Sequence, residues 1–184
     1  VLFIFLFVVQ KPLFMLFYHD LFHGCSFIDY LLVIWHGLPL DASISGYLTI
    51  LPGFFLIASL WLNSSITKWT FKIYYATVAV MMGLIFVSDM ILYKYWGFRL
   101  DSTPLFYLKT PKDAFASADL ITIFLGLLAV VVIISALFFF FYHILIKSGK
   151  NIKKPFYRSK TTIVLLLLTG FLFIPIRGGF SVST

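Results

Sequence analysis

The sequence has very little charge, a single cysteine and no glutamate, so all seven of its acidic residues are aspartates. Charged residues make up 11% of its 184 positions, against roughly 25% in a soluble domain, and hydrophobic residues make up 61%. A soluble fold needs a polar exterior that this composition cannot supply. The lone Cys25 excludes an internal disulfide and a cysteine-rich metal site. The composition therefore predicts an integral membrane protein.

Five apolar segments are candidates for helices that cross the roughly 30 Å of bilayer hydrocarbon. They cover residues 1–18, interrupted by Lys11-Pro12, and residues 42–62, 69–93, 120–146 and 161–176. Residues 27–35 are too short to cross and are expected to form an interfacial helix on the outer leaflet. Residues 97–118 are expected to form a short outer juxtamembrane segment, with Ser117 or Asp119 as N-cap of the fourth span. The predicted fold is an all-α integral membrane domain with five transmembrane helices.

Basic residues predict the orientation of these spans. The connection over residues 147–160 carries six Lys or Arg and no acid, and Lys68 and Lys72 add to the same side, giving eight basic residues against five on the other. By the positive-inside rule the N-terminus is cytoplasmic and the C-terminus extracytoplasmic. Because the sequence opens with Val1 inside an apolar run and ends shortly after the fifth span, we expect residues 1–184 to be the N-terminal membrane part of a longer protein.

Charge is concentrated in residues 89–115, which hold seven charged residues in 27 positions. With the predicted topology, one group of charged residues lies near the outer head-group level, where charge costs far less than at the bilayer centre. Asp89 lies inside the end of the third span and is expected to pair with Arg99 or Arg177. The group serves either as interhelical contacts or as a pocket for an anionic lipid head group, in which Arg binds phosphate bidentately. The candidate head-group residues are Asp41, Asp89, Arg99, Asp101 and Arg177.

Other functional patterns are weak. His19, Asp20 and His23 have a spacing that puts both imidazoles on one helix face, as in metal-binding helices, but no further ligand is identifiable and no metal site is assigned. The sequence has no nucleophile with an adjacent base, no glycine-rich phosphate loop and no paired carboxylates, so no catalytic residue is predicted. The basic segment 147–160 is expected to contact anionic head groups and not nucleic acid.

Three stretches in order, HGLPLDASISGYLTILP, DMILYKYWGFRLDSTPLFYLKTPKDAFAS and IPIRGGF, carry a family resemblance. Over residues 36–179 the chain resembles the membrane half of lipoteichoic acid synthase-like proteins in their Bacteroidetes form. These are phosphoglycerol transferases of the sulfatase and alkaline phosphatase superfamily. The resemblance implies a multi-pass protein of the bacterial cytoplasmic membrane, with five spans preceding an extracytoplasmic catalytic domain.

In that family, a threonine nucleophile and a divalent metal, often manganese, transfer glycerol phosphate from a phosphatidylglycerol-type lipid. The resemblance places these catalytic parts beyond Thr184 and implies no cofactor within residues 1–184. It gives the chain a role in anchoring and lipid presentation, with membrane lipids and its own C-terminal domain as partners.

Several alternatives stay open. Relatives transfer phosphoethanolamine or hydrolyse sulfate or phosphate esters, and the chain could also be a non-catalytic anchor or assembly subunit whose charged group binds a partner protein. A transporter or channel is disfavoured because the second, fourth and fifth predicted spans have no ionisable residue near their middle.

Overall fold

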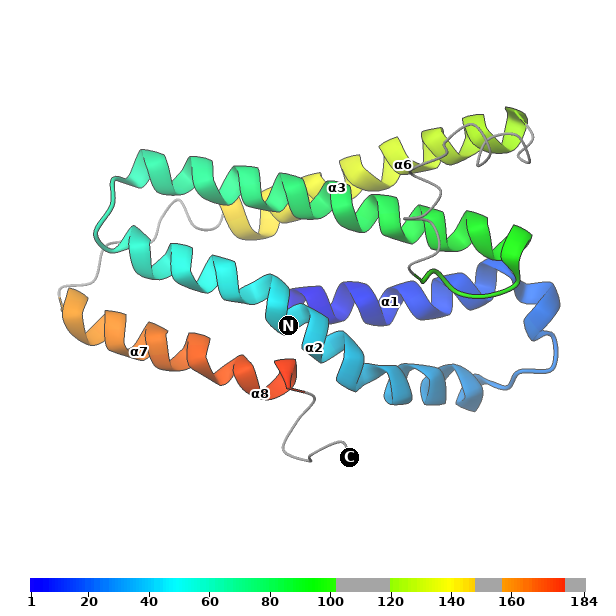
Figure 1. Cartoon of the computed structure of the whole chain (residues 1–184), viewed down its shortest axis with the longest axis horizontal. Coiled ribbons are helices and arrows are strands. Elements are labelled where there is room, and N and C mark those ends of the chain that lie inside the picture. The colour runs from blue at the N-terminus through cyan, green and yellow to red at the C-terminus, as the bar shows by residue number, and fades with distance from the viewer. Residues whose placement is uncertain (102–119, 148–156, 178–184) are drawn as a thin grey trace. The chain divides into compact units, whose positions relative to one another are not determined.

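The structure, a computed structural model, describes residues 1–101, 120–147 and 157–177. Every regular secondary-structure element in these ranges is a helix. Figure 1 shows the helices. The chain divides into two compact units, Val1–Thr70 with Lys153–Thr184, and Phe71–Ile152. The prediction of an all-α protein is confirmed.

The first unit contains five helical elements and the start of a sixth. They are α1 (Leu2–Phe17), the short 3-10 helix η1 (His19–Phe22), α2 (Phe27–Ser59), the first turns of α3 (Ser64–Trp96), α7 (Arg158–Phe171) and α8 (Phe173–Ile176). A capping box fixes the start of α2: the Ser26 hydroxyl accepts from the Ile28 N–H, and the Ser26 N–H donates to Asp29 Oδ2 at 2.6 Å. Such reciprocal bonds satisfy donors that the first turn leaves unpaired.

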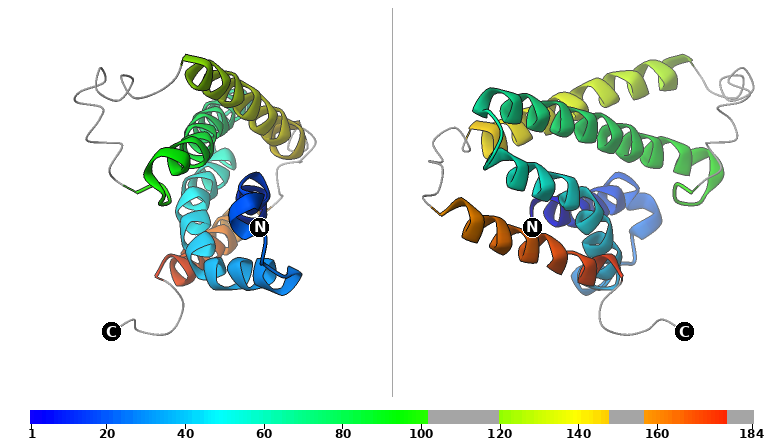
Figure 2. Two further views of the ribbon diagram at one scale, coloured as in Figure 1. Left: turned by 90° about the vertical axis from the view of Figure 1, so that its right-hand side faces the viewer. Right: turned by 60° about the vertical axis from the view of Figure 1, so that its left-hand side comes forward.

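The predicted boundary between an interfacial helix and the second span is wrong. Residues 27–35 and 42–59 belong to one continuous helix of 33 residues, α2, which has Pro39 and Pro52 in its interior. Proline removes one helical hydrogen bond and bends a helix without having to end it, and α2 bends along its length in Figure 2. At 1.5 Å per residue, α2 is about 50 Å long, more than a bilayer's hydrocarbon requires. Whether residues 27–35 lie at the membrane surface stays a prediction.

Four helices of the described residues are long and apolar enough to cross a membrane, where the sequence predicted five. They are Phe27–Ser59, Ser65–Trp96, Leu120–Ile144 and Arg158–Ile176. The fifth candidate, α1, is apolar but has only 16 residues, fewer than the roughly 20 that a perpendicular crossing needs. The expected interruption at Lys11-Pro12 is also wrong, because α1 continues through Pro12. The predicted N-caps Ser117 and Asp119 and most of the outer segment 97–118 lie outside the described residues.

Small residues mark the helix contacts within the first unit. A Cβ on Gly53 would lie 2.7 Å from Thr169 Oγ1, and one on Gly46 would lie 2.7 Å from Ile176 Cγ1, so α2 approaches α7 and α8 closely. The Ser43 hydroxyl donates to the Ile176 carbonyl at 3.0 Å. Small residues at helix contacts and side-chain hydrogen bonds between helices are typical of membrane proteins, in which the surrounding lipid gives no hydrophobic drive for association.

The second unit contains most of α3 packed against α6 (Leu120–Phe141), which continues as a π-helical segment, η2 (Tyr142–Lys147). Three contacts set the register. The Tyr75 and Phe141 rings lie 5.4 Å apart between centroids. A Cβ on Gly83 would lie 2.5 Å from Ile134 Cγ1, and one on Gly126 would lie 2.6 Å from Ile91 Cδ1. The partners on α6 come in reverse order, so the two helices are antiparallel.

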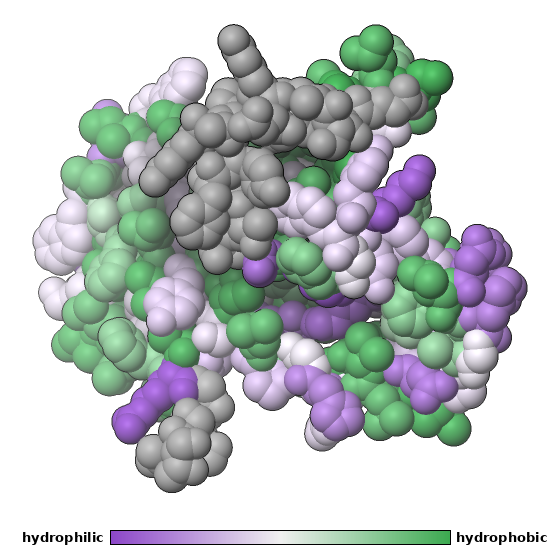
Figure 3. Space-filling view, turned by 45° about the vertical axis from the view of Figure 1, so that its right-hand side comes forward, coloured by the Kyte–Doolittle hydropathy of each residue, from purple (hydrophilic) through white to green (hydrophobic). Residues whose placement is uncertain are grey.

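The outer surface of these helices is apolar. In α6 only Gly126, Leu137 and Phe141 are buried, whereas Leu120 is 81% exposed. Figure 3 shows apolar side chains spread over much of one face of the molecule. Exposure of so many large apolar side chains is disfavoured in water. Lipid is therefore the medium that this surface fits.

Candidate functional site

Asp89, in the second unit, is a buried carboxylate that is held by Arg99 and by a backbone N–H. The residue is 4% exposed. Arg99 contacts both of its oxygens, through Nε to Oδ1 at 3.0 Å and Nη2 to Oδ2 at 2.5 Å. The Leu100 backbone N–H also donates to Oδ1, at 2.9 Å. Asp89 was predicted to pair with Arg99 or Arg177, and the pairing with Arg99 is confirmed, in the bidentate geometry that makes Arg–carboxylate pairs strong.

A glycine turn at the end of α3 brings Arg99 back to Asp89. Gly97 has a φ of +71°, in the left-handed region, and its N–H donates to the Tyr93 carbonyl at 2.9 Å. Glycine is the usual residue at this position because it has no Cβ to oppose the conformation. Past the turn, the Phe98 ring stacks on the Trp96 ring with centroids 5.7 Å apart. The chain thus folds back along its own helix.

Arg99 is held by Asp89 and is about half exposed. Its side chain is 48% exposed, whereas that of Asp89 is 5% exposed. A guanidinium carries five N–H donors on three nitrogens, and Asp89 contacts two of those nitrogens. A guanidinium held in this way can also bind an oxyanion such as phosphate at the membrane surface.

The first unit contains a second buried ion pair, which the sequence did not predict. Lys11 Nζ in α1 contacts Asp41 Oδ2 in α2, and the two side chains are 15% and 6% exposed. Asp41 was predicted as an outer head-group residue, but here it forms an ion pair between two helices. Its burial leaves little surface through which a lipid could reach it.

Gly37 makes room for this pair. A Cβ at position 37 would collide with Lys11 Cε and lie 2.7 Å from Lys11 Nζ. Gly37 lies one helical turn before Asp41, so the same face of α2 provides both the space for the lysine stem and the carboxylate that binds its ammonium. One sequence signal could have identified the pair: Lys11 is the only basic residue of its apolar segment, and Asp41 is the only acid in residues 30–88.

The other predicted site residues divide between the units. Asp101 is exposed in the second unit, and Arg177 is exposed in the first unit, directly after the α8 residue that Ser43 contacts. The structure therefore brings Asp89 together with Arg99, and Asp41 with Lys11. That Asp41, Asp89, Arg99, Asp101 and Arg177 line one common site stays a prediction.

Comparison of the chain with protein-family models, curated proteins and solved structures finds no match. The functional assignment therefore depends on the chemistry of the two pairs and of the apolar helices. The resemblance to lipoteichoic acid synthase-like proteins stays a prediction.

The Lys11–Asp41 pair is expected to couple α1 to α2. Lys11→Met or Asp41→Leu alone leaves one buried charge without its partner and should lower the free energy of unfolding by about 3–5 kcal/mol. The double variant leaves no unpaired charge and should be more stable than either single variant. Unfolding in mixed micelles, followed by tryptophan fluorescence, measures the cycle, with the exposed Lys68→Met as control. If the loss in free energy of unfolding of the double variant equals the sum of the losses of the two single variants, the two residues are not coupled.

Proposed function

We propose that the chain is the membrane domain of an enzyme that transfers phospholipid head groups, of the phosphoglycerol transferase type. In this proposal, the helices anchor an extracytoplasmic catalytic domain in a bacterial cytoplasmic membrane. They also hold the head group of a phosphatidylglycerol-type lipid for that domain. The observation that carries the lipid-binding role is the half-exposed Arg99 guanidinium, held in place by the buried Asp89.

The chemistry of Arg99 favours a phosphate ligand. A phosphodiester is a monoanion with two free oxygens, and the planar, oriented fork of a guanidinium matches these oxygens better than a flexible lysine does. The turn at Gly97 follows the last residue of α3, Trp96, and aromatic residues such as Tyr93, Tyr95 and Trp96 are enriched where membrane meets water. This position supports contact with head groups and not with acyl chains.

The competing role for Arg99 is purely structural, as the partner that keeps Asp89 from being a lone buried charge. Both roles predict loss of stability when Arg99 alone is changed. They differ for a variant in which both charges are removed together, because such a variant keeps the helix packing but lacks the phosphate-binding group.

The first test is head-group transfer by the full-length gene product in proteoliposomes that contain labelled phosphatidylglycerol, with manganese in the buffer. Transfer breaks the bond between phosphorus and the diacylglycerol oxygen, so release of diacylglycerol reports it. We expect release from the wild type and a fall of roughly tenfold or more in Arg99→Gln/Asp89→Asn, since a hydrogen bond to a charged group contributes about 1.5–3 kcal/mol. The control variant Arg158→Gln changes an exposed arginine that is predicted to lie on the cytoplasmic side, and it should release as much diacylglycerol as the wild type.

Three outcomes would change the proposal. If the wild type releases diacylglycerol from phosphatidylethanolamine but not from phosphatidylglycerol, a phosphoethanolamine transferase would be favoured. No release from either lipid would contradict a phospholipid donor. If the double variant releases as much diacylglycerol as the wild type at equal protein level, the chain would still belong to a transferase, but Arg99 would have only a structural role.

The proposed orientation can be tested on the single native cysteine. Cys25 is exposed in the connection between η1 and α2, and a cytoplasmic N-terminus with α1 crossing places this connection outside. A membrane-impermeant maleimide should therefore label Cys25 in spheroplasts without lysis, and Cys25→Ser should abolish that label. Cys25→Ser/Ser159→Cys moves the thiol to the exposed start of α7 and should be labelled only after lysis. The reverse pattern would contradict the orientation.

A further inference from the structure

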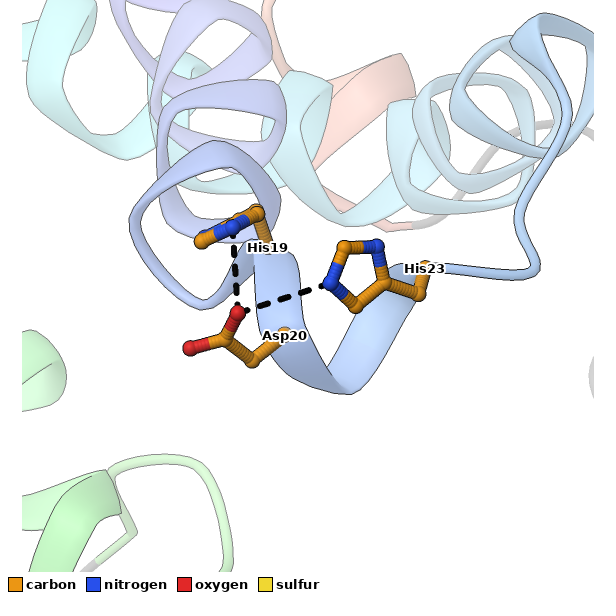
Figure 4. A group of neighbouring side chains, drawn as sticks. All are labelled: His19, Asp20 and His23. Carbon is orange, nitrogen blue, oxygen red and sulfur yellow. Dashed lines mark ion pairs between the residues drawn. The ribbon is translucent and has the colours of Figure 1, made fainter.

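Three side chains that can bind a metal ion meet in the connection after α1, and none of them belongs to either ion pair described above. His19 and Asp20 belong to η1, and His23 follows it. One ligand atom from each residue lies within 4.8 Å of the other two. Figure 4 shows both imidazole rings turned toward the Asp20 carboxylate.

The distances between these atoms suit a shared metal ion. His19 Nε2 lies 3.0 Å and His23 Nε2 lies 3.5 Å from Asp20 Oδ1. Ligand atoms about 2.1 Å from a tetrahedral zinc ion lie about 3.4 Å from one another. An ion can thus bind all three groups after small side-chain rotations.

The backbone already holds the three residues in this arrangement. The Leu21 N–H donates to the Tyr18 carbonyl at 2.9 Å, and the Cys25 N–H donates to the Phe22 carbonyl at 2.9 Å. The two imidazole rings also contact each other edge to face, with centroids 5.1 Å apart. Because the backbone of this connection is already ordered, metal binding would cost little backbone entropy.

We propose that His19, Asp20 and His23 bind a divalent transition metal ion of the zinc class. Two imidazole nitrogens and one carboxylate oxygen are ligands that zinc accepts, and three protein ligands leave one tetrahedral position for water. Calcium and magnesium prefer sites made of oxygen alone. Bound metal would fasten the connection that leads from α1 into α2.

Two features of the surroundings favour a cation here. The connection follows the C-terminus of a 16-residue helix, α1, and the C-terminal end of a helix carries partial negative charge. In addition, residues 12–67 contain no Lys or Arg, so no basic side chain of that segment competes for the Asp20 carboxylate. The site therefore has a net attraction for a divalent ion.

Equilibrium dialysis of the purified protein against Zn²⁺, followed by elemental mass spectrometry of bound zinc, tests the site. The protein is prepared in detergent micelles without a histidine tag. We expect the wild type to bind one zinc more than His19→Gln or His23→Gln, and Asp20→Asn to weaken this binding roughly tenfold or more. His36→Gln, at an exposed histidine of α2, should bind as the wild type does. Excess Mg²⁺ or Ca²⁺ should not displace the ion.

Two further measurements make the result decisive. The three side chains are 63%, 82% and 72% exposed, so their replacement should leave the circular dichroism spectrum unchanged. Substitution of Co²⁺ for zinc should give a visible d–d spectrum that both histidine variants lose. Equal zinc in the wild type and both histidine variants would overturn the proposal. A loss of zinc caused by Cys25→Ser and by neither histidine variant would assign the metal to the thiol and would overturn it as well.

Discussion

A carboxylate that is removed from water must have a cation beside it, and this constraint shapes both units. Asp41 and Asp89 are each 4% exposed, and a buried charge without a partner costs several kcal/mol. The local structure around each meets that need. Gly97 reverses the chain so that Arg99 returns to Asp89, and Gly37 opens a space on α2 through which Lys11 reaches Asp41.

The two pairs have similar chemistry but different access. In the Lys11–Asp41 pair the cation is 15% exposed, and it lies between two helices; in the Asp89–Arg99 pair the cation is 48% exposed, and it follows a turn at the end of a helix. The first arrangement suits coupling of α1 to α2. The second places a fixed guanidinium that is half exposed at the end of a helix, and for this reason the proposed head-group contact is assigned to Arg99.

Much of the fold could be predicted from composition and pattern, because a long apolar run such as that of α6 has few alternatives to a membrane helix. The Asp89–Arg99 pair was also predictable, since the partners lie close in sequence around a glycine. The continuity of α2 could not be predicted, because a proline such as Pro39 disfavours a helix but does not forbid it. The Lys11–Asp41 pair joins residues 30 positions apart, so it depends on how α1 and α2 pack, and the only sequence signal for it was the isolation of each charge in apolar sequence.

The central claim is that Arg99 binds a lipid phosphate while Asp89 holds it in place. Residues 1–184 contain three arginines, Arg99, Arg158 and Arg177. In the Arg158→Lys/Arg177→Lys variant of this part of the protein, ¹³C label on the arginine guanidinium carbon reports Arg99 alone. Solid-state NMR in phosphatidylglycerol bilayers then measures the dipolar coupling between this carbon and lipid ³¹P. We predict clear dephasing, corresponding to a carbon–phosphorus separation of about 4 Å for a hydrogen-bonded guanidinium and phosphate. Absence of dephasing, with the Asp89 pair intact, would contradict the account.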